Sequence, residues 1–216
     1  MPTRREVLFN ILSAPLAAAA LVQHPLEPVS TLPEIIPEPH CLSEESANGF
    51  RLLLSRNRLA SRAVSPKVII VPASRQLSSA TGRELLRYAV GGAWLILESG
   101  LSFMPREEAI RQIQLVRDVF GLEVRTPLAN GGTYIEYTWP LRRFVRDFSM
   151  FTPVECSRTE RIAELGGVTV CARRPVGKGG IIFLGSMLGP GLLAEEREAH
   201  ELGSAMLHSI RKQSDL

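Results

Sequence analysis

Two short apolar runs with an amphipathic stretch between them predict a strand, a helix and a second strand. Residues 68–71 are β-branched without alternation, which is typical of a strand covered on both faces. Residues 85–90 carry apolar side chains at helical spacing, and Gly91 and Gly92 end that helix because glycine takes the left-handed conformation at little cost. The second run, residues 93–97, follows the first after about twenty residues, too far for a hairpin. We therefore expect parallel strands joined by a right-handed helical crossover.

Other stretches predict further helices and strands around this unit. Residues 43–56 and 105–121 place apolar side chains on one helical face, and the second stretch begins with proline and ends with glycine, as helices often do. Residues 133–138 alternate as a strand, and the glycine pair at 166–167 predicts a hairpin. A last helix is expected over residues 192–211. Together these elements predict an α/β domain.

The first residues have the three parts of an export signal. Arg4 and Arg5 precede an uncharged, mostly apolar stretch over residues 7–22, with small residues suited to a cleavage site at 17–20. The paired arginines resemble the twin-arginine type of signal, which carries folded proteins across a membrane. The alternatives are an N-terminal helix packed on the domain and an uncleaved signal that acts as an anchor.

This pattern divides the chain into three parts. Residues 1–21 are the predicted signal peptide, and residues 22–42 a proline-rich tether or arm in which residues 35–36 can dock as a short edge strand. Residues 43–216 are expected to form a single domain. The protein is expected to be periplasmic or otherwise exported, and to touch a membrane only through a retained signal segment.

Charge and cysteine content narrow the choice of partners. The net charge is only +3 and no basic run exceeds two residues, so a nucleic-acid partner is not expected. The three cysteines show no CxxC or other metal-binding spacing, so we expect no metal and no cofactor. In an oxidising compartment one disulfide is feasible, and Cys156 and Cys171 are the expected pair because both lie in the same strand-rich region.

Residues 141–151 mix arginine with phenylalanine. Such a mixture can bind an anionic ligand, a glycan, a membrane surface or a protein partner. It can equally be an amphipathic covering segment whose arginine stems lie over apolar neighbours. If the segment binds a partner, the expected contact residues are Arg143, Phe144, Arg146 and Phe148.

A glycine-rich link, residues 185–191, connects a predicted strand to the last helix. Its backbone N–H groups could face an anion, as at phosphate-binding turns. A tight turn is the preferred interpretation of this link.

Three motifs occur in this order within residues 67–191: VIIVPASRQLS, LLRYAVGGAWLILESG and RRPVGKGGIIFLGSMLGPGL. Their order and spacing resemble the class I glutamine amidotransferase-like superfamily, in its non-catalytic branch found in bacterial envelope proteins. The resemblance implies a three-layer, flavodoxin-like fold with a central, mainly parallel sheet between helices and a small β-hairpin addition. It also implies that ligands bind at the carboxyl ends of the strands.

The chain departs from the catalytic members of that superfamily at both functional motifs. Those members carry a cysteine nucleophile on a sharp strand-to-helix elbow and a His-x-Glu pair after a late strand. Here Glu98, Ser99 and Gly100 follow the central strand, and Gly185-Ser186-Met187 stands where the histidine and glutamate are expected. Without a thiolate and a base, glutamine hydrolysis has no mechanism, so no catalytic residue is assigned.

The sequence therefore predicts an exported, non-catalytic binding or scaffold domain of the bacterial envelope. Its ligand would be a small molecule or an envelope protein. The expected ligand-binding residues lie at the strand ends: Ser74, Arg75, Glu98, Ser99, Ser102 and Ser186.

Two alternative functions stay open. One is a hydrolase that uses Ser99 or Ser102 with Glu98, although a serine nucleophile needs a base and the histidines lie only in the tether and the last helix. The other is an envelope accessory factor that binds a protein partner through residues 141–151.

Overall fold

A computed structural model describes residues 34–35, 41–57, 68–74, 77–129, 134–146, 150–155 and 159–214. All of them belong to one compact unit, residues 31–216. The predicted signal peptide lies outside the described residues, as does most of the predicted tether. Within the described part, no helix combines the length and apolar character needed to cross a membrane.

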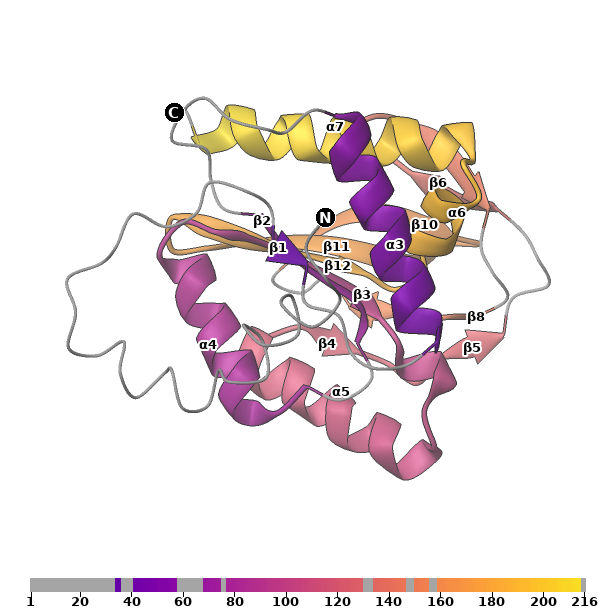
Figure 1. Ribbon diagram of the computed structural model, residues 1–216. Coiled ribbons are helices and arrows are strands. Elements are labelled where there is room, and N and C mark those ends of the chain that lie inside the picture. The colour runs from indigo at the N-terminus through magenta and orange to yellow at the C-terminus, as the bar shows by residue number, and fades with distance from the viewer. Residues whose placement is uncertain are drawn as a thin grey trace. The chain divides into compact units, whose positions relative to one another are not determined.

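The unit is built on one sheet of eight strands (Figure 1). From one edge to the other, its strands are β1 (Glu34–Ile35), β2 (Val68–Ser74), β3 (Trp94–Ser99), β12 (Gly179–Leu184), β11 (Val168–Val176), β10 (Glu160–Leu165), β6 (Tyr134–Tyr137) and β7 (Arg143–Arg146).

The parallel part of the sheet contains the predicted strand–helix–strand unit. β2 and β3 pair in parallel, with Ile69 opposite Leu95, and β12 adds to β3 in the same direction. Helix α4 (Ser79–Val90) connects them, and the Ser78 hydroxyl caps its start by accepting from the Thr81 N–H at 3.0 Å. β1 pairs in parallel with β2. The expected parallel pairing and the expected edge strand near residue 35 are both confirmed.

The other part of the sheet corrects the predicted fold. β12, β11, β10, β6 and β7 follow one another in antiparallel pairs, so the sheet is mixed, with four antiparallel pairs and three parallel ones. The predicted flavodoxin-like fold with a mainly parallel sheet is therefore wrong. The hairpin of β10 and β11 is not an addition, because it lies in the middle of the sheet. The hydrophobic pattern locates a strand along the sequence but does not identify the strands with which it pairs. For this reason the antiparallel pairs were not predicted.

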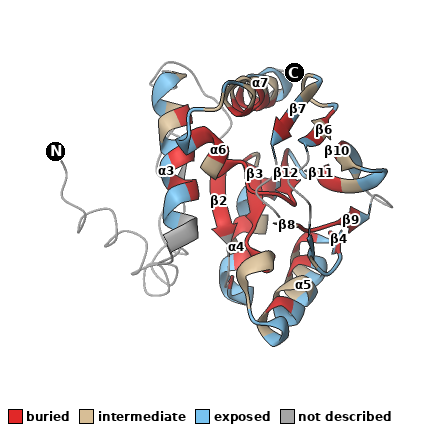
Figure 2. Ribbon diagram, turned by 90° about the vertical axis from the view of Figure 1, so that its right-hand side faces the viewer, coloured by how far each residue is buried: buried red, intermediate tan, exposed pale blue. Residues whose placement is uncertain are grey.

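Helices lie on both faces of the sheet (Figures 1 and 2). One face carries α3 (Cys41–Arg56), α6 (Gly189–Leu193) and α7 (Arg197–Ser214), and the other carries α4 and α5 (Arg106–Phe120). Because side chains alternate along a strand, Ile70 and Ile96 join the core under α3 and α7, while Ile69 and Leu95 join the core under α4 and α5. The sheet therefore separates two hydrophobic cores.

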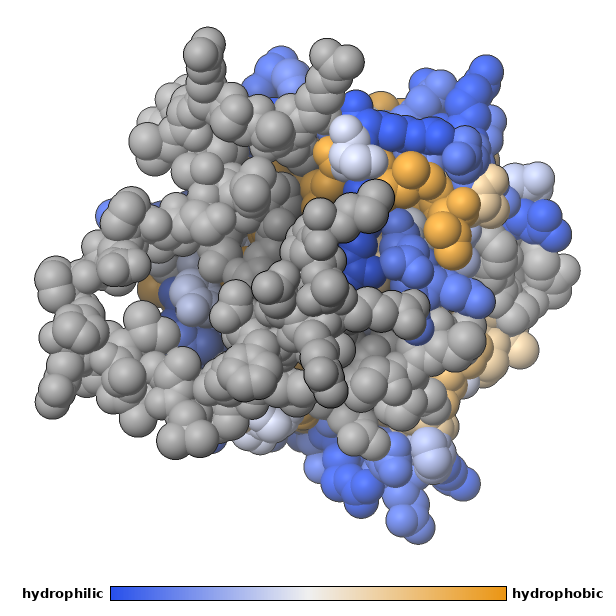
Figure 3. Space-filling view, viewed as in Figure 1, coloured by the Kyte–Doolittle hydropathy of each residue, from blue (hydrophilic) through white to orange (hydrophobic). Residues whose placement is uncertain are grey.

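The predicted last helix is two helices in the structure. α6 ends at Leu193 and α7 begins at Arg197, and between them Glu195 adopts a positive φ of 60°. The outward side of α7 is hydrophilic, whereas an apolar area lies over α6, where Leu193 is exposed (Figure 3).

Smaller elements complete the unit. They are the 3-10 helix η1 (Leu101–Phe103) and two two-stranded sheets, which pair β4 (Glu123–Val124) with β9 (Val154–Glu155) and β5 (Leu128–Ala129) with β8 (Met150–Phe151). The predicted covering segment, residues 141–151, thus contributes β7 to the main sheet and β8 to a small one.

Candidate site at the carboxyl ends of the parallel strands

Glu98 lies near the carboxyl end of the central strand β3 and is 1% exposed. Its Oε2 accepts hydrogen bonds from the Ser46 hydroxyl of α3 and, at 2.9 Å, from the Ala73 N–H of β2. Its Oε1 accepts the Gly189 N–H at the start of α6 at 2.8 Å. One buried carboxyl group therefore joins a helix, a strand and the beginning of a second helix to β3.

The surroundings of Glu98 act on its pKa in two directions. Burial raises the pKa above its ordinary value of 4.5, because the charged form loses its hydration. The hydrogen bonds from Ser46 and from backbone N–H groups favour the charged form and oppose that rise. The net effect is a raised pKa, so Glu98 holds its proton more tightly than an exposed glutamate does.

Ser99 is also buried, and its hydroxyl lies 2.7 Å from the hydroxyl of Thr152. A neutral hydroxyl is not a general base that could activate a serine nucleophile. A cavity of about 30 Å³ lies beside Ser99, between β3 and α5, and has room for about one water molecule. Gln112 lines this cavity, and its side-chain amide is bonded to both backbone groups of Leu77.

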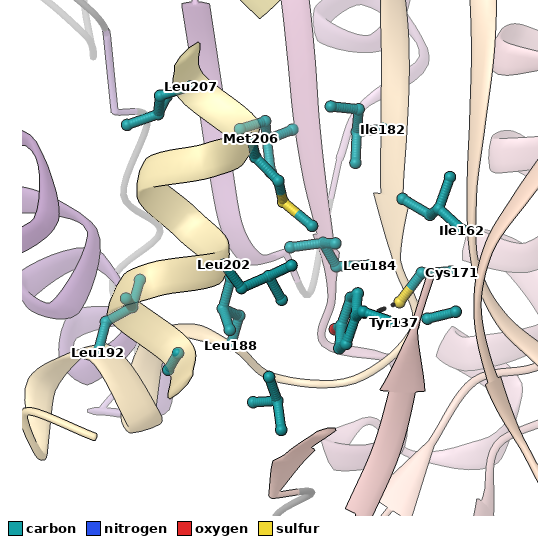
Figure 4. Close-up of a cluster of buried hydrophobic side chains, with 14 of the residues drawn as sticks. Tyr137, Ile162, Cys171, Ile182, Leu184, Leu188, Leu192, Leu202, Met206 and Leu207 are labelled. Atoms are coloured by element: carbon teal, nitrogen blue, oxygen red, sulfur yellow. Dashed lines mark hydrogen bonds between the residues drawn. The ribbon is translucent and has the colours of Figure 1, made fainter. Parts of the chain in front are cut away.

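A second buried polar group lies nearby in the core beneath α7 (Figure 4). The Cys171 thiol donates to the Tyr137 hydroxyl oxygen over 3.5 Å, and Ser186 also hydrogen-bonds to Tyr137. Burial raises the pKa of Tyr137 well above its ordinary value. Because Cys171 carries a thiol here and Cys156 lies outside the described residues, the predicted disulfide between them stays a prediction.

Four of the predicted strand-end residues are described together with their exposure, and none of these four is fully exposed. Glu98, Ser99 and Ser186 are buried, and Ser102 is half-buried in η1. Ser74 ends β2 opposite Ser99, and Arg75 lies outside the described residues.

Sequence reasoning missed three polar residues of this region: Ser46, Tyr137 and Thr152. Tyr137 alternates with exposed neighbours along β6, which could have marked it as inward-facing. Ser46 and Thr152 meet their partners 52 and 53 residues away, and nothing local in the sequence indicates such contacts.

The glycine-rich link binds a carboxyl group of the chain itself. The Gly189 N–H points to the Glu98 carboxyl group, while the Gly185 N–H is used by the Val170 carbonyl at 3.0 Å. Both of these N–H groups are therefore engaged inside the protein.

In the predicted partner-binding segment, Arg143 bonds to Glu201 of α7 at 2.8 Å, whereas Phe144 is 50% exposed and Arg146 is exposed. Phe148 lies outside the described residues.

Within the described part of the chain, His200 is engaged away from Ser99. His200 Nε2 lies 2.9 Å from the Leu192 carbonyl, so that histidine is engaged within the α6–α7 corner and not with Ser99. Among the described residues, no three histidine, cysteine, aspartate or glutamate side chains gather closely enough to hold a metal ion.

Comparison with known proteins finds similarity in structure only. No model of a protein family matches the chain, and no curated protein matches it. Among solved structures, β-galactosidase from Rahnella sp. R3 is 14% identical, with a TM-score of 0.61 over 95% of this chain and 34% of its own.

Two further matches have the same character. The β-galactosidase from Bacillus circulans sp. alkalophilus is 14% identical, with a TM-score of 0.54 over 79% of this chain and 27% of its own. The exo-β-1,4-mannosidase from Opitutaceae bacterium strain TAV5 is 17% identical, with a TM-score of 0.57 over 90% of this chain and 38% of its own. This chain therefore spans well under half the length of the glycoside hydrolases that it matches.

These matches correct the assignment made from sequence motifs. The named structures are glycoside hydrolases, so the comparisons overturn the predicted membership in the glutamine amidotransferase-like superfamily. Of the expected functions, the hydrolase alternative agrees better with these matches than the non-catalytic binding domain does. At 12–17% identity the similarity shows the fold alone: the chain has a mixed α/β fold that also forms part of larger glycoside hydrolases.

Proposed function

We propose that the protein is a non-catalytic domain with a fold shared by part of larger glycoside hydrolases, and that it acts by binding at its surface. The observation that carries this proposal is the state of Glu98. Both oxygens of its carboxyl group accept hydrogen bonds from the chain itself, and the side chain is buried. A carboxyl group held in this way supports the structure and is not available to a substrate.

Glycoside hydrolysis sets a requirement that Glu98 does not meet. Most glycosidases use a pair of carboxyl groups that flank the scissile bond, one as acid and the other as base or nucleophile. Both groups must reach the sugar, and at 1% exposure Glu98 does not reach any molecule in solvent.

A hydrolase is the second candidate, and the names of the matched structures favour it. In such a hydrolase the nucleophile is Ser99 or Ser102, and Glu98 assists it. The observed geometry does not assist Ser99, because its hydroxyl faces Thr152 and the Glu98 oxygens face Ser46, Ala73 and Gly189.

A hydrolysis assay separates the two candidates. The purified full chain is incubated with nitrophenyl β-galactoside and with nitrophenyl β-mannoside. The variants Ser99→Ala and Ser102→Ala are assayed separately in the same way, and Ser55→Ala, at an exposed position of α3, is the control. We expect no release of nitrophenol above buffer by any of the four proteins. Hydrolysis by the wild type that Ser99→Ala or Ser102→Ala abolishes and Ser55→Ala keeps would establish the hydrolase instead.

We also propose that the protein is exported, on the basis of Arg4, Arg5 and the apolar stretch after them. Residues 1–21 fused to a reporter should direct it out of the cytoplasm, and replacing both arginines by lysine should retain the reporter inside. Equal export of the two fusions would contradict a twin-arginine signal.

A further inference from the structure

We propose that the outer edge of β7, with the adjoining face of β6, binds an extended acidic segment of another protein as an added strand. This inference rests on the proposed function, in which the chain acts through its surface, and names the chemistry of the partner.

β7 is the last strand of the sheet and pairs, among the described strands, with β6 alone (Figure 2). An edge strand presents a row of backbone N–H and C=O groups that can pair with an extended peptide. The edge is therefore a template for one more strand.

The register of β6 and β7 identifies the side chains beside that edge. Tyr134 lies opposite Arg146, and Glu136 lies opposite Phe144. Ile135, Tyr137 and Val145, which alternate with these residues along the two strands, are buried in the core beneath α7. Because side chains alternate, Tyr134, Glu136, Phe144 and Arg146 share the opposite face of the sheet.

This face combines exposed aromatic rings with positive charge. Tyr134 is 60% exposed and Phe144 is 50% exposed. Arg142 lies 5.9 Å above the Phe144 ring and forms an ion pair with Glu136. Arg146 is exposed and has no ion pair within the described part of the chain. A carboxylate on the added strand would pair with Arg146, and an apolar side chain would pack on Phe144.

Strand β7 is held in place by the side chains on its face toward α7. Val145 is 3% exposed, and Arg143 bonds to Glu201 of α7 at 2.8 Å. A strand fixed in this way loses little conformational freedom when it binds, which favours affinity.

Charge argues against a second copy of the chain as the occupant. If two β7 edges met in antiparallel fashion with Phe144 opposite Phe144, Arg146 of one copy would lie opposite Arg142 of the other. Like charges opposite each other destabilise a strand pair. A segment rich in glutamate or aspartate matches the edge instead.

The test uses two short fluorescent peptides with the repeats Glu-Thr-Val-Thr and Lys-Thr-Val-Thr, so that one face of the extended peptide alternates the charged residue with valine. Binding to the full chain is followed by fluorescence anisotropy. We expect the glutamate peptide to bind at least tenfold more tightly than the lysine peptide. Arg146→Glu should abolish that preference and Phe144→Ser should weaken binding at least several-fold. Arg111→Glu, which makes the same charge change on exposed α5, should leave both affinities unchanged.

Several results would overturn the inference. They are equal binding of the two peptides, binding of neither, and an effect of Arg111→Glu as large as that of Arg146→Glu. A dimer in sedimentation that Phe144→Ser dissolves would show that a second copy is the occupant. The peptide assay contains no glycoside, so its failure is distinguishable from a failure of the proposed function in the hydrolysis assay.

Discussion

The backbone N–H of Gly189 donates to Glu98 Oε1 over 2.8 Å, across 91 residues of sequence. The same carboxyl group accepts the Ala73 N–H, and Ala73 adopts a φ of +39°, a conformation that side-chain-bearing residues rarely take. With the Ser46 hydroxyl as third donor, Glu98 fixes the positions of α3, the end of β2 and the start of α6. Glu98 lies at the position expected of a ligand site, but its hydrogen bonds hold three parts of the chain together. We call this role an internal tie.

Replacing Glu98 by alanine should destabilise the protein strongly. The change leaves the Ser46 hydroxyl and the N–H groups of Ala73 and Gly189 buried without an acceptor, and each such group costs about 1–3 kcal/mol. We expect the free energy of unfolding in urea to fall by about 3 kcal/mol or more. Glu45→Ala, at an exposed position of α3, is the control and should have the unfolding free energy of the wild type. A Glu98→Ala variant as stable as that control would contradict the role of the tie.

Glu98 should also make stability depend on pH. A carboxyl group whose pKa is higher in the folded than in the unfolded state binds its proton more tightly when folded. Its contribution to stability is therefore fully present below the ordinary value of 4.5 and is lost as the pH rises through the raised, folded-state pKa.

The variant Glu98→Gln tests this pH dependence, because glutamine does not titrate. Its amide nitrogen faces a backbone N–H, so the variant should be less stable than the wild type at every pH. The difference in unfolding free energy between the two proteins should shrink as the pH rises from 4.5 to neutrality. A difference that stays constant over this range would exclude Glu98 as a source of pH dependence.

Local sequence signals predicted local structure well. Gly121 ends α5 in the left-handed conformation, and Gly166 and Gly167 both have positive φ in the hairpin turn. Each of these depends on a few neighbouring residues. The antiparallel order of β11, β10, β6 and β7 depends instead on which strands meet across the sheet, and side-chain pattern does not specify that.

The sequence located Glu98 at the end of a strand but did not predict its burial. The sequence identified Glu98 as a residue at a strand end, where ligands bind in open parallel sheets. It carried no signal that Ser46, 52 residues earlier, would cover the carboxyl group, or that Gly189 would bind it from the other side. Burial decides between a ligand site and an internal tie, and burial arises from tertiary packing.

Close packing of α3 on α6 provides the next prediction. A Cβ atom at Gly49 would overlap the Gly189 carbonyl group. Because this group belongs to the backbone, it cannot rotate away as a side chain can. Gly49→Ala should therefore separate the two helices and lower the unfolding free energy by roughly 3 kcal/mol, at the upper end for overpacking. Gly166→Ala, where a Cβ meets nothing within 4 Å but φ is +56°, should cost only about 1 kcal/mol of backbone strain. Equal losses in the two variants would contradict close helix packing at Gly49.

Tyr137 and Tyr134 lie on the same strand and offer the last comparison. The Tyr137 hydroxyl is buried, accepts the Cys171 thiol and bonds to Ser186, whereas Tyr134 is 60% exposed. Tyr137→Phe removes the hydroxyl and leaves Ser186 without that bond, so the unfolding free energy should fall by about 1 kcal/mol or more. Tyr134→Phe makes the identical chemical change in solvent and should have no measurable effect. If the two variants unfold at the same urea concentration, the buried hydrogen bonds of Tyr137 contribute nothing to stability, and its ring alone explains its place in the core.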